Sequence, residues 1–336
     1  RGMKLGLDNM KELLNKLGNP HKTKNIKFIH ITGTNGKGSV SAMLSSILTK
    51  AGKKVGMFTS PHLINVTERI KINDQPITEE RLLAYIQNAR PYIDEIGNTF
   101  FETINAIAFQ YFADEAVEYA IIEVGLGGMH DSTNVIQSKI AILTDIKLDH
   151  CHILGNKIED ITKDKCGIIK EQCKVITSNK GTVLDIIKKT CQEKNVELYT
   201  TDTTASFTNL RGTFQKQNVA LAEQAAKLLE IKQEHILSGL QQVKWPGRMQ
   251  YITYENQSFL VDCAHNPAAF TTLWDELTKN QKKKIIILSM CKEKDIEQCL
   301  TTLKDEKHTF ILTKADIERA TDPEQLRKYL PRALLA

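Results

Sequence analysis

Short apolar runs alternate with helical patterns along most of the chain. Strand-like runs of this kind cover residues 26–32, 54–58, 118–124 and 140–146. The last two are apolar almost without a break, which is typical of strands covered on both faces. Between the first two runs, apolar residues recur at helical spacing and predict a helix over 37–51. This alternation predicts a parallel, doubly wound sheet.

The same alternation continues to about residue 243. It predicts a helix over 156–169, a strand over 174–177, a helix over 184–194, a strand over 196–199, and helices over 215–230 and 233–243. Proline and glycine then interrupt the pattern in Trp245-Pro246-Gly247-Arg248. We therefore expect a hinge at 245–248 that separates a domain of residues 1–244 from a domain of residues 249–336.

The segment after the hinge repeats the pattern on a smaller scale. Strands are predicted over 259–262, 284–288 and 309–313, with helices after Pro267 and near 296–303. No terminal strand is evident before Ala336, so we expect this domain to be shortened. The predicted fold class is α/β. A P-loop-type, doubly wound, mostly parallel sheet domain precedes a smaller, shortened C-terminal α/β Rossmann-like domain.

Composition excludes several classes of protein. A length of 336 residues suits about two domains, and the net charge of +5 is spread along the chain, which is poor evidence for nucleic acid. Seven cysteines include no Cys-x-x-Cys pair, which favours reduced thiols. No apolar run reaches the roughly 20 residues of a membrane span. We expect a cytoplasmic protein, and the start at Arg1 predicts that the true beginning is missing.

A glycine-rich loop follows the first predicted strand directly. It reads Gly33-Thr34-Asn35-Gly36-Lys37-Gly38-Ser39, and a helix follows it. Glycines allow backbone N–H groups to surround phosphate oxygens, and the helix start adds partial positive charge. Lys37 can reach the β- and γ-phosphates, and the Ser39 hydroxyl can bind a metal ion or a phosphate. The spacing differs from the standard phosphate loop, since Gly38 separates the lysine from the serine.

A second glycine cluster does not predict a dinucleotide site. Gly125-Leu126-Gly127-Gly128 follows the strand over 118–124, but His130 stands where the third glycine of that fingerprint is needed. NAD binding is therefore not expected.

The loop GTNGKGS is similar to that of the folylpolyglutamate synthase/dihydrofolate synthase family of Mur ligases. Further similar motifs follow in order: Thr59-Ser60-Pro61-His62-Leu63, Glu68-Arg69-Ile70, Phe101-Glu102, Glu123 to Gly128 with Asp131 and Thr133-Asn134, Leu148-Asp149-His150, Lys165 to Lys170, Gln215 with Asn218, Trp245 to Arg248, and Asp262 to Pro267. The resemblance covers nearly the whole chain. It implies a ligase that uses Mg²⁺ and ATP and acts in folate biosynthesis and one-carbon metabolism.

The resemblance implies a metal site with ligands Ser39, Ser60, Glu123 and His150. Glu123 closes a buried strand at its carboxyl end, where a carboxylate binds a metal or is a costly buried charge. From the residues alone, His150 suits a hydrogen-bonded core histidine and Ser60 a turn residue before Pro61. Lys165, read alone, is a solvated helix lysine, whereas the resemblance implies a carbamylated lysine that supports the metal site.

The resemblance also implies the contacts of the substrates. Nucleotide contacts are expected from Thr34, Asn35, Gly36, Lys37, Gly38, Ser39, Asn218, Arg248 and Asp262, and contacts of the acyl substrate from Ser60, His62, Phe101, Glu102 and Asp131. The expected catalytic residues are Lys37, Lys165, Asp262 and His265. Alternatives stay open: Asn218 suits a helix surface, Arg248 a linker, Asp262 and His265 a surface ion pair, and Phe101 an apolar core with Phe100.

One departure from the family pattern bears on substrate preference. Members usually have Gly-Gly-Arg-Leu-Asp where this chain has Gly-Gly-Met129-His130-Asp131, so a positive charge is missing.

The activity implied is addition of L-glutamate to dihydropteroate, to a folate, or to both, through an acyl phosphate, with two Mg²⁺ ions and closure of the second domain. The partners expected are ATP, L-glutamate and the pteroate or folate, with neither nucleic acid nor membrane, in a monomer. Two other hypotheses remain: a Mur-type ligase of peptidoglycan precursors, and a nucleotide- or folate-binding protein without ligase activity.

Overall fold

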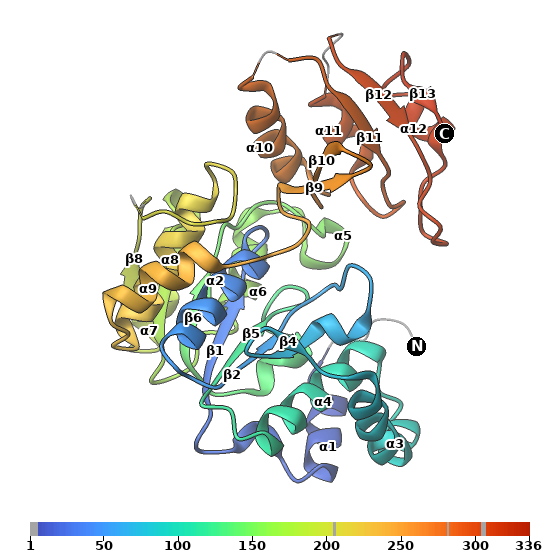
Figure 1. The fold of residues 1–336 in the computed structure, drawn as a ribbon. Helices are drawn as coiled ribbons and strands as arrows, with labels where there is room; N and C mark the ends of the chain where they lie inside the picture. Colours follow the sequence, from blue (N-terminus) through green and yellow to red (C-terminus); the bar gives the residue numbers. More distant parts are fainter. Residues whose placement is uncertain (1–5, 204–205, 281, 304–306) are drawn as a thin grey trace. The chain divides into compact units, whose positions relative to one another are not determined.

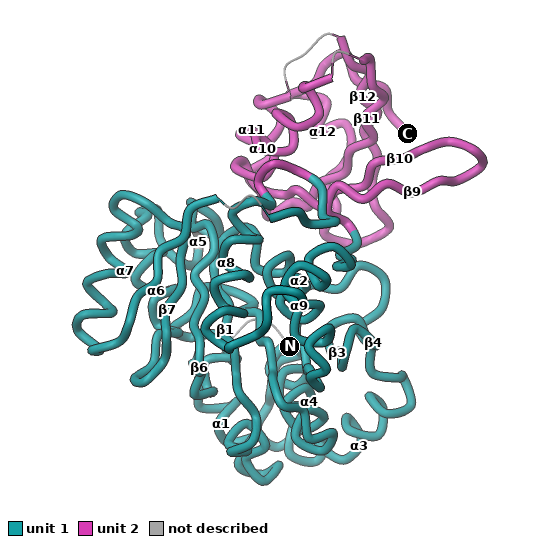
Figure 2. The backbone as a smooth tube through the Cα atoms, turned by 60° about the vertical axis from the view of Figure 1, so that its left-hand side comes forward, with its two compact units in different colours: residues 1–211, 215–246 teal, residues 212–214, 247–336 magenta. Residues whose placement is uncertain are grey.

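The computed structural model of the chain describes residues 6–203, 206–280, 282–303 and 307–336. It divides into two compact units, which are described separately below. The first comprises residues 1–211 and 215–246, and the second comprises residues 212–214 and 247–336 (Figure 2).

An eight-stranded sheet forms the centre of the first unit (Figure 1). Its strands are β1 (Lys27–Thr32), β2 (Val55–Phe58), β3 (Ile70–Ile72), β4 (Gln75–Pro76), β5 (Tyr119–Glu123), β6 (Ser138–Leu143), β7 (Lys174–Thr177) and β8 (Leu198–Thr200). The order is β4-β3-β2-β5-β1-β6-β7-β8. β3 pairs antiparallel with both β2 and β4, and all other neighbouring strands pair in parallel. The carboxyl ends of the central strands therefore meet at one edge.

Helices cover both faces of this sheet. One face carries α2 (Lys37–Lys50), α8 (Gln215–Leu228) and α9 (Gln233–Gln242), and the other carries α1 (Asp8–Lys16), α4 (Phe100–Asp114), α6 (Ile158–Cys166) and α7 (Gly181–Glu193). α3 (Glu79–Ile96) packs on α1 and α4, and α5 (Cys151–Leu154) precedes α6. Short 3₁₀ helices cover Pro20–Lys22, Val66–Arg69 and Ser132–Val135.

Burial on both faces explains the unbroken apolar runs. In β1, Ile29 and Ile31 join the core under α2, while Phe28 joins the core under α4. The sequence prediction of a doubly wound parallel sheet is confirmed.

The strand predicted over 140–146 ends earlier, at Leu143. The main-chain oxygen of Asp145 accepts hydrogen bonds from the glycine-rich loop, and residues 144–146 lie outside the strand.

The second unit is a smaller α/β structure. It contains a hairpin of β9 (Gln250–Tyr254) and β10 (Gln257–Val261), a parallel sheet of β11 (Ile285–Leu288), β12 (Thr309–Leu312) and β13 (Leu334–Leu335), and helices α10 (Pro267–Thr278), α11 (Ile296–Thr301) and α12 (Pro323–Arg327). Its core gathers apolar residues from all three helices and β12, including Phe270, Leu300, Phe310 and Leu326.

The strand predicted over 259–262 is present as β10, which pairs with β9 in the antiparallel hairpin. One sequence expectation for this unit was wrong. A terminal strand, β13, exists and pairs with β12, but its two residues are too few to give a pattern in the sequence. The predicted fold class of two α/β units, the second smaller, is confirmed. Among the described residues, none of the helices combines the length and apolar character that a bilayer span requires.

Candidate active site

The glycine-rich loop lies at the carboxyl edge of the large sheet, between β1 and α2. Gly36 stands immediately before α2 with φ 90°, a conformation that glycine adopts without the steric cost paid by other residues. At Gly33 a Cβ atom would lie 1.9 Å from the Thr144 hydroxyl oxygen. The strand therefore turns into the helix within a space that admits no side chain at either glycine.

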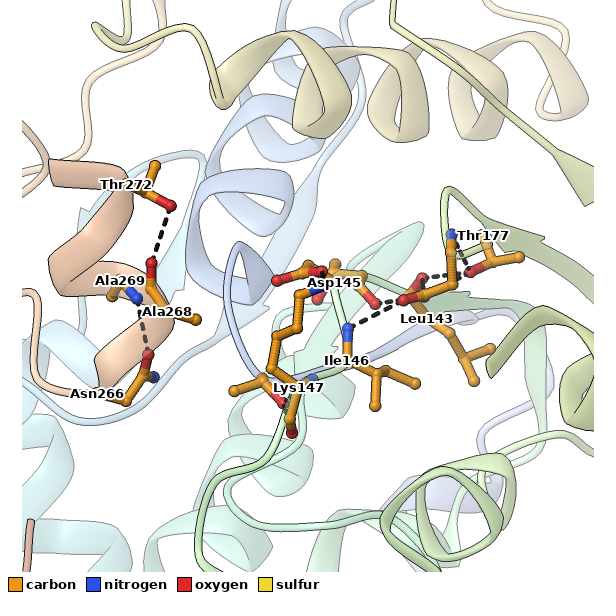
Figure 3. A network of polar contacts seen from close by, with 12 residues as sticks. Leu143, Asp145, Ile146, Lys147, Thr177, Asn266, Ala268, Ala269 and Thr272 are labelled. Carbon is orange, nitrogen blue, oxygen red and sulfur yellow. Dashed lines mark hydrogen bonds and ion pairs between the residues drawn. The ribbon is translucent and has the colours of Figure 1, made fainter. Parts of the chain in front are cut away.

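Main-chain hydrogen bonds fix the first half of the loop. The N–H groups of Thr34 and Asn35 donate to the Asp145 carbonyl at 2.7 and 3.2 Å. The Thr34 hydroxyl lies 3.0 Å from both the carbonyl oxygen and the N–H of Lys147 (Asp145 and Lys147 in Figure 3). Because the first amides of a helix have no carbonyl of an earlier turn to bind, the start of α2 supplies the donors for a phosphate.

Two lysine side chains meet the carbonyl of Gly33. Lys37 Nζ donates to Gly33 O at 3.0 Å and to Thr34 O at 3.3 Å, and Lys165 Nζ donates to Gly33 O at 3.2 Å. The two amine groups thus lie beside one carbonyl oxygen. This arrangement suits an anion in the loop.

Lys165 is buried, with 4% of its surface exposed. Burial, and then the charge of Lys37, lower its pKa from 10.5 to about 7, against the opposing charges of Asp164, Asp149 and Asp131. A Cβ atom on Gly128 would lie 2.8 Å from Lys165 O, so the second glycine cluster packs directly on this turn of α6. The interpretation of Lys165 as a solvated helix lysine is therefore wrong.

Helix α8 contributes side chains beside the loop. Asn218 Nδ2 donates to Gln215 Oε1 at 2.8 Å, and Gln215 Nε2 donates to Ser39 Oγ at 3.4 Å. A Cβ on Gly36 would lie 2.4 Å from Asn218 Oδ1. Asn218 is buried against the loop, which contradicts its interpretation as a helix-surface residue.

The indole of Trp245 covers the start of α2. A Cβ on Gly38 would lie 2.9 Å from its ring, and the ammonium of Lys71 lies 5.4 Å from the ring centroid. The unusual glycine between Lys37 and Ser39 thus makes room for an aromatic ring.

A buried carboxylate ends β5 beside the β2 loop. Glu123 is 4% exposed, and one of its carboxylate oxygens accepts the Ser60 N–H at 3.1 Å. β2 and β5 are parallel neighbours, so their carboxyl ends bring Ser60 and Glu123 together. Arg69 lies nearby: burial lowers its pKa, while the charge of Glu123 opposes that effect. Arg69 Nε also donates to His62 Nδ1 at 2.9 Å.

Two residues expected at the acyl substrate, Asp131 and Glu102, accept hydrogen bonds from backbone N–H groups of the protein itself. Asp131 accepts the N–H groups of Leu126 and Thr133, both at 2.9 Å, and burial raises its pKa. Glu102 forms a capping box with Thr99 at the start of α4, with its carboxylate 2.7 Å from the Thr99 N–H.

Phe101 supports the second glycine cluster. Its ring lies where a Cβ on Gly125 would approach to 2.4 Å, and its centroid is 5.8 Å from that of Phe58. The core packing that the sequence offered as an alternative is therefore present for Phe101, whereas Phe100, its expected core partner, is exposed.

His150 has a left-handed backbone, with φ 53°, just before α5. Its N–H donates to Asp149 Oδ1 at 2.8 Å, and its Nε2 lies 3.9 Å from Asp149 Oδ2. Within the described parts of the chain, no three His, Cys, Asp or Glu side chains form a ready-made metal cage. The carboxylate of Glu123 beside Ser60 is nevertheless an oxygen donor of the kind that Mg²⁺ prefers, when water and phosphate complete its ligands.

The remaining predicted residues belong to the second unit. Asp262 accepts the N–H groups of Met249 at 2.9 Å and Ala264 at 2.8 Å. Arg248 donates to Gly247 O at 3.0 Å, and the exposed His265 places Nδ1 2.9 Å from Cys263 O. These bonds order the turn that leads to Asn266, whose side chain caps α10 at Ala269 N (Figure 3).

The sequence analysis missed the polar residues that follow β7. Asn179 and Thr177 bind the backbone at 143–146, next to the Asp145 carbonyl that holds the loop. The signal was present, because Thr177-Ser178-Asn179 is a polar run at the carboxyl end of a predicted parallel strand, where such sheets place ligand sites.

The fold and the loop define a class: α/β proteins that hold a nucleotide phosphate between a parallel strand and the helix after it. Family comparison refines this class. Residues 31–251 match the Mur ligase middle domain, and residues 247–334 match the Mur ligase glutamate ligase domain.

Among curated proteins, the chain is 34% identical to the dihydrofolate synthase/folylpolyglutamate synthase of Bacillus subtilis, over 95% of this chain and 83% of that protein. Among solved structures, it is similar to E. coli FolC in complex with DHPP and ADP, with a TM-score of 0.90, 29% identity and coverage of 100% and 85%. A bifunctional synthase with Mn, AMPPNP and L-glutamate bound gives a TM-score of 0.89, 28% identity and coverage of 100% and 86%.

The chain belongs to the folylpolyglutamate synthase/dihydrofolate synthase family of Mur ligases. The resemblance described from the motifs is thus confirmed. The chain is an ATP-dependent ligase that forms carbon–nitrogen bonds, and the hypotheses of a peptidoglycan-precursor ligase and of a non-catalytic binding protein are not supported.

Proposed function

We propose that this ligase adds L-glutamate to dihydropteroate, to a folate, or to both, through an acyl phosphate. The observation that carries the proposal is the pair of lysines, Lys37 and Lys165, at the carbonyl of Gly33 in a fixed phosphate loop. The relatives named above are synthases of this kind, and solved neighbours hold ADP, an ATP analogue, DHPP and L-glutamate.

The chemistry requires activation of a carboxylate. A carboxylate oxygen of the acyl substrate attacks the γ-phosphorus of ATP, and ADP leaves. The amine of L-glutamate then attacks the acyl carbon, phosphate leaves, and the nitrogen loses a proton to give the amide. Lys37 and the first N–H groups of α2 stabilise the negative charge of the phosphoryl group during its transfer. Catalysis rests on positioning, which the rigid loop supplies.

We infer that Glu123, with the hydroxyls of Ser60 and Ser39, holds Mg²⁺, and that His150 is a further ligand. Burial of a carboxylate is costly unless cations or hydrogen-bond donors offset its charge, and carboxylate and hydroxyl oxygens suit Mg²⁺. The bound ions, two in our prediction, would neutralise charge on the phosphates of ATP. A solved neighbour holds Mn together with an ATP analogue.

We also infer that Lys165 is carbamylated. A pKa of about 7 leaves much of this amine neutral, and the neutral amine is the form that attacks CO₂. The nitrogen forms a bond to the carbon of CO₂ and releases a proton, which converts a cation into an anion. Denaturation reverses the reaction, so native mass spectrometry or carbon-13 NMR with labelled bicarbonate is the appropriate measurement. A Lys165→Met protein that gives the same labelled signal would refute this assignment.

The test of the main proposal is phosphate release from Mg·ATP and L-glutamate, with dihydropteroate and tetrahydrofolate added separately. Release that requires one of them identifies the acyl substrate. Equal release with and without either, in folded protein that binds ATP, refutes the proposal. A Lys37→Met variant is the matched control for contaminating ATPases, since it removes the charge and keeps an unbranched side chain of similar length.

The other predicted contacts and properties stay predictions. They are the nucleotide contacts of Arg248 and Asp262, the catalytic roles of Asp262 and His265, the substrate contacts of His62, Phe101, Glu102 and Asp131, the monomeric state and the cytoplasmic location. Alanine variants assayed with the identified substrate test each contact.

A further inference from the structure

Asn179 lies beyond the end of β7 and is largely buried, with 9% of its surface exposed. Its amide makes hydrogen bonds to a neighbouring segment of backbone. Oδ1 accepts the N–H of Ile146 at 3.0 Å, and Nδ2 donates to Thr144 O at 2.7 Å and more distantly to Leu143 O at 3.3 Å. One side chain therefore binds the peptide groups on both sides of Asp145.

Thr177 fixes the amide of Asn179 in this position. Its hydroxyl oxygen accepts Asn179 Nδ2 at 2.8 Å and the Asn179 N–H at 3.2 Å, and the hydroxyl donates to Leu143 O at 2.9 Å. Figure 3 shows Thr177, Leu143, Asp145 and Ile146 joined along this edge of the sheet.

Asp145 connects the hydrogen bonds of Asn179 and Thr177 to the phosphate loop. Its carbonyl oxygen belongs to the same peptide group as the Ile146 N–H that Asn179 binds, and it accepts the N–H groups of Thr34 and Asn35. Asn179 thus orients the acceptor, and the acceptor orients the loop. No bond of Asn179 reaches the loop itself among those that the structure describes.

We infer that Asn179 is a positioning residue for the phosphates of ATP. It holds the Asp145 carbonyl so that the loop has its binding shape before the nucleotide arrives. Loss of the amide leaves the N–H of Ile146 and the C=O of Thr144 without partners in a buried place, so the segment shifts to find new ones. The phosphate loop, which is hydrogen-bonded to the Asp145 carbonyl, then shifts with this segment. Part of the free energy of ATP binding is used to restore the loop, so the affinity falls.

The experiment compares Asn179→Ala and Asn179→Asp with Asn73→Gly. Asn179→Asp keeps an acceptor for Ile146 N but loses the donors to Thr144 O and Leu143 O. Asn73 is a matched control because its Oδ1 accepts the Val55 N–H at 2.8 Å at the start of β2, away from the loop, and glycine suits its φ of 46°. Affinity for Mg·AMPPNP is measured by titration calorimetry, and kcat and KM by phosphate release.

We expect both Asn179 variants to weaken Mg·AMPPNP binding about 10- to 100-fold, with a matching rise in KM for ATP. The KM for L-glutamate should stay within about twofold of the wild-type value. Asn73→Gly should lose stability and keep nucleotide affinity. Thr177→Val, which removes only the hydroxyl beneath the amide, should weaken binding by a smaller factor, and it carries the test if Asn179→Ala does not fold.

The inference rests on ATP as the nucleotide of the proposed function, and the measurements separate the two. Wild-type protein that does not bind Mg·AMPPNP overturns the proposed function. Wild-type protein that binds, with folded Asn179 variants that bind equally well, overturns the inference alone. Equal losses in the Asn179 variants and in Asn73→Gly also overturn it, because they would reflect general destabilisation.

Discussion

Gly36 offers a precise test of the loop geometry. The substitution Gly36→Ala adds one methyl group at the residue before α2. Two separate costs follow from the structure: the φ of 90° becomes unfavourable, and the new Cβ lies 2.4 Å from Asn218 Oδ1.

The two costs can be estimated separately. A left-handed backbone costs a non-glycine residue about 1–2 kcal/mol. The clash displaces the buried Asn218 amide from Gln215 Oε1, and a buried group left without its partner costs about 1–3 kcal/mol. We therefore expect Gly36→Ala to lower the free energy of unfolding by about 2–5 kcal/mol.

A double-mutant cycle with Asn218→Ala separates the two costs. In that background no side-chain amide meets the new methyl group, so only the backbone cost of about 1–2 kcal/mol should remain. Urea unfolding followed by circular dichroism gives the four free energies, and calorimetry with Mg·AMPPNP reports whether the loop still binds nucleotide.

Additivity would refute this reasoning. If Gly36→Ala costs the same in the presence and absence of the Asn218 side chain, the contact between them carries no energy. A Gly36→Ala protein with wild-type stability and nucleotide affinity would refute the backbone argument as well.

Three further substitutions test other parts of the site. Burial lowers the pKa of Lys165 from 10.5 to about 7, so the unfolded chain binds more protons than the folded chain between these pH values. The free energy of unfolding should therefore rise with pH across this window in CO₂-free buffer. Urea unfolding of Lys165→Met should lack this slope, and an unchanged slope would contradict the assignment. Glu123→Gln should raise the Mg²⁺ concentration needed for half-maximal phosphate release at least about tenfold, because the change removes the charge that would bind the ion; an unchanged Mg²⁺ requirement would count against a metal role. Glu102→Ala breaks the capping box at Thr99 and should cost about 0.5–2 kcal/mol in urea unfolding; a raised KM for the acyl substrate at unchanged stability would favour the substrate role instead.

Periodicity predicted the first unit well because its strands are buried on both faces. β5 is buried at every position and β1 at every position after Lys27, so apolar residues follow one another in both strands instead of alternating with exposed polar ones. In the second unit β9, and with it the hairpin that it forms with the predicted strand β10, escaped prediction because these strands are largely exposed and carry no such run. β13 escaped because two residues form no pattern.

The loop residues were predictable from the sequence because their chemistry is local. Glycines, a lysine and a helix start stand within seven residues, and no tertiary information is needed to read them. The surroundings of Lys165 were not predictable in this way. Its burial depends on Gly33, Gly128 and Lys37, which are distant in sequence, so only the family resemblance indicated a special role.

The contact between Trp245 and Gly38 also makes the site observable by intrinsic tryptophan fluorescence. The chain has two tryptophans, Trp245 and Trp274, and Trp274 stacks on Phe310 in the core of the second unit. A Trp274→Phe protein would therefore emit from one indole, which rests on the first turn of the helix where phosphate binds. Its emission would respond to the charge of an arriving nucleotide, so nucleotide occupancy could be followed in real time without a label.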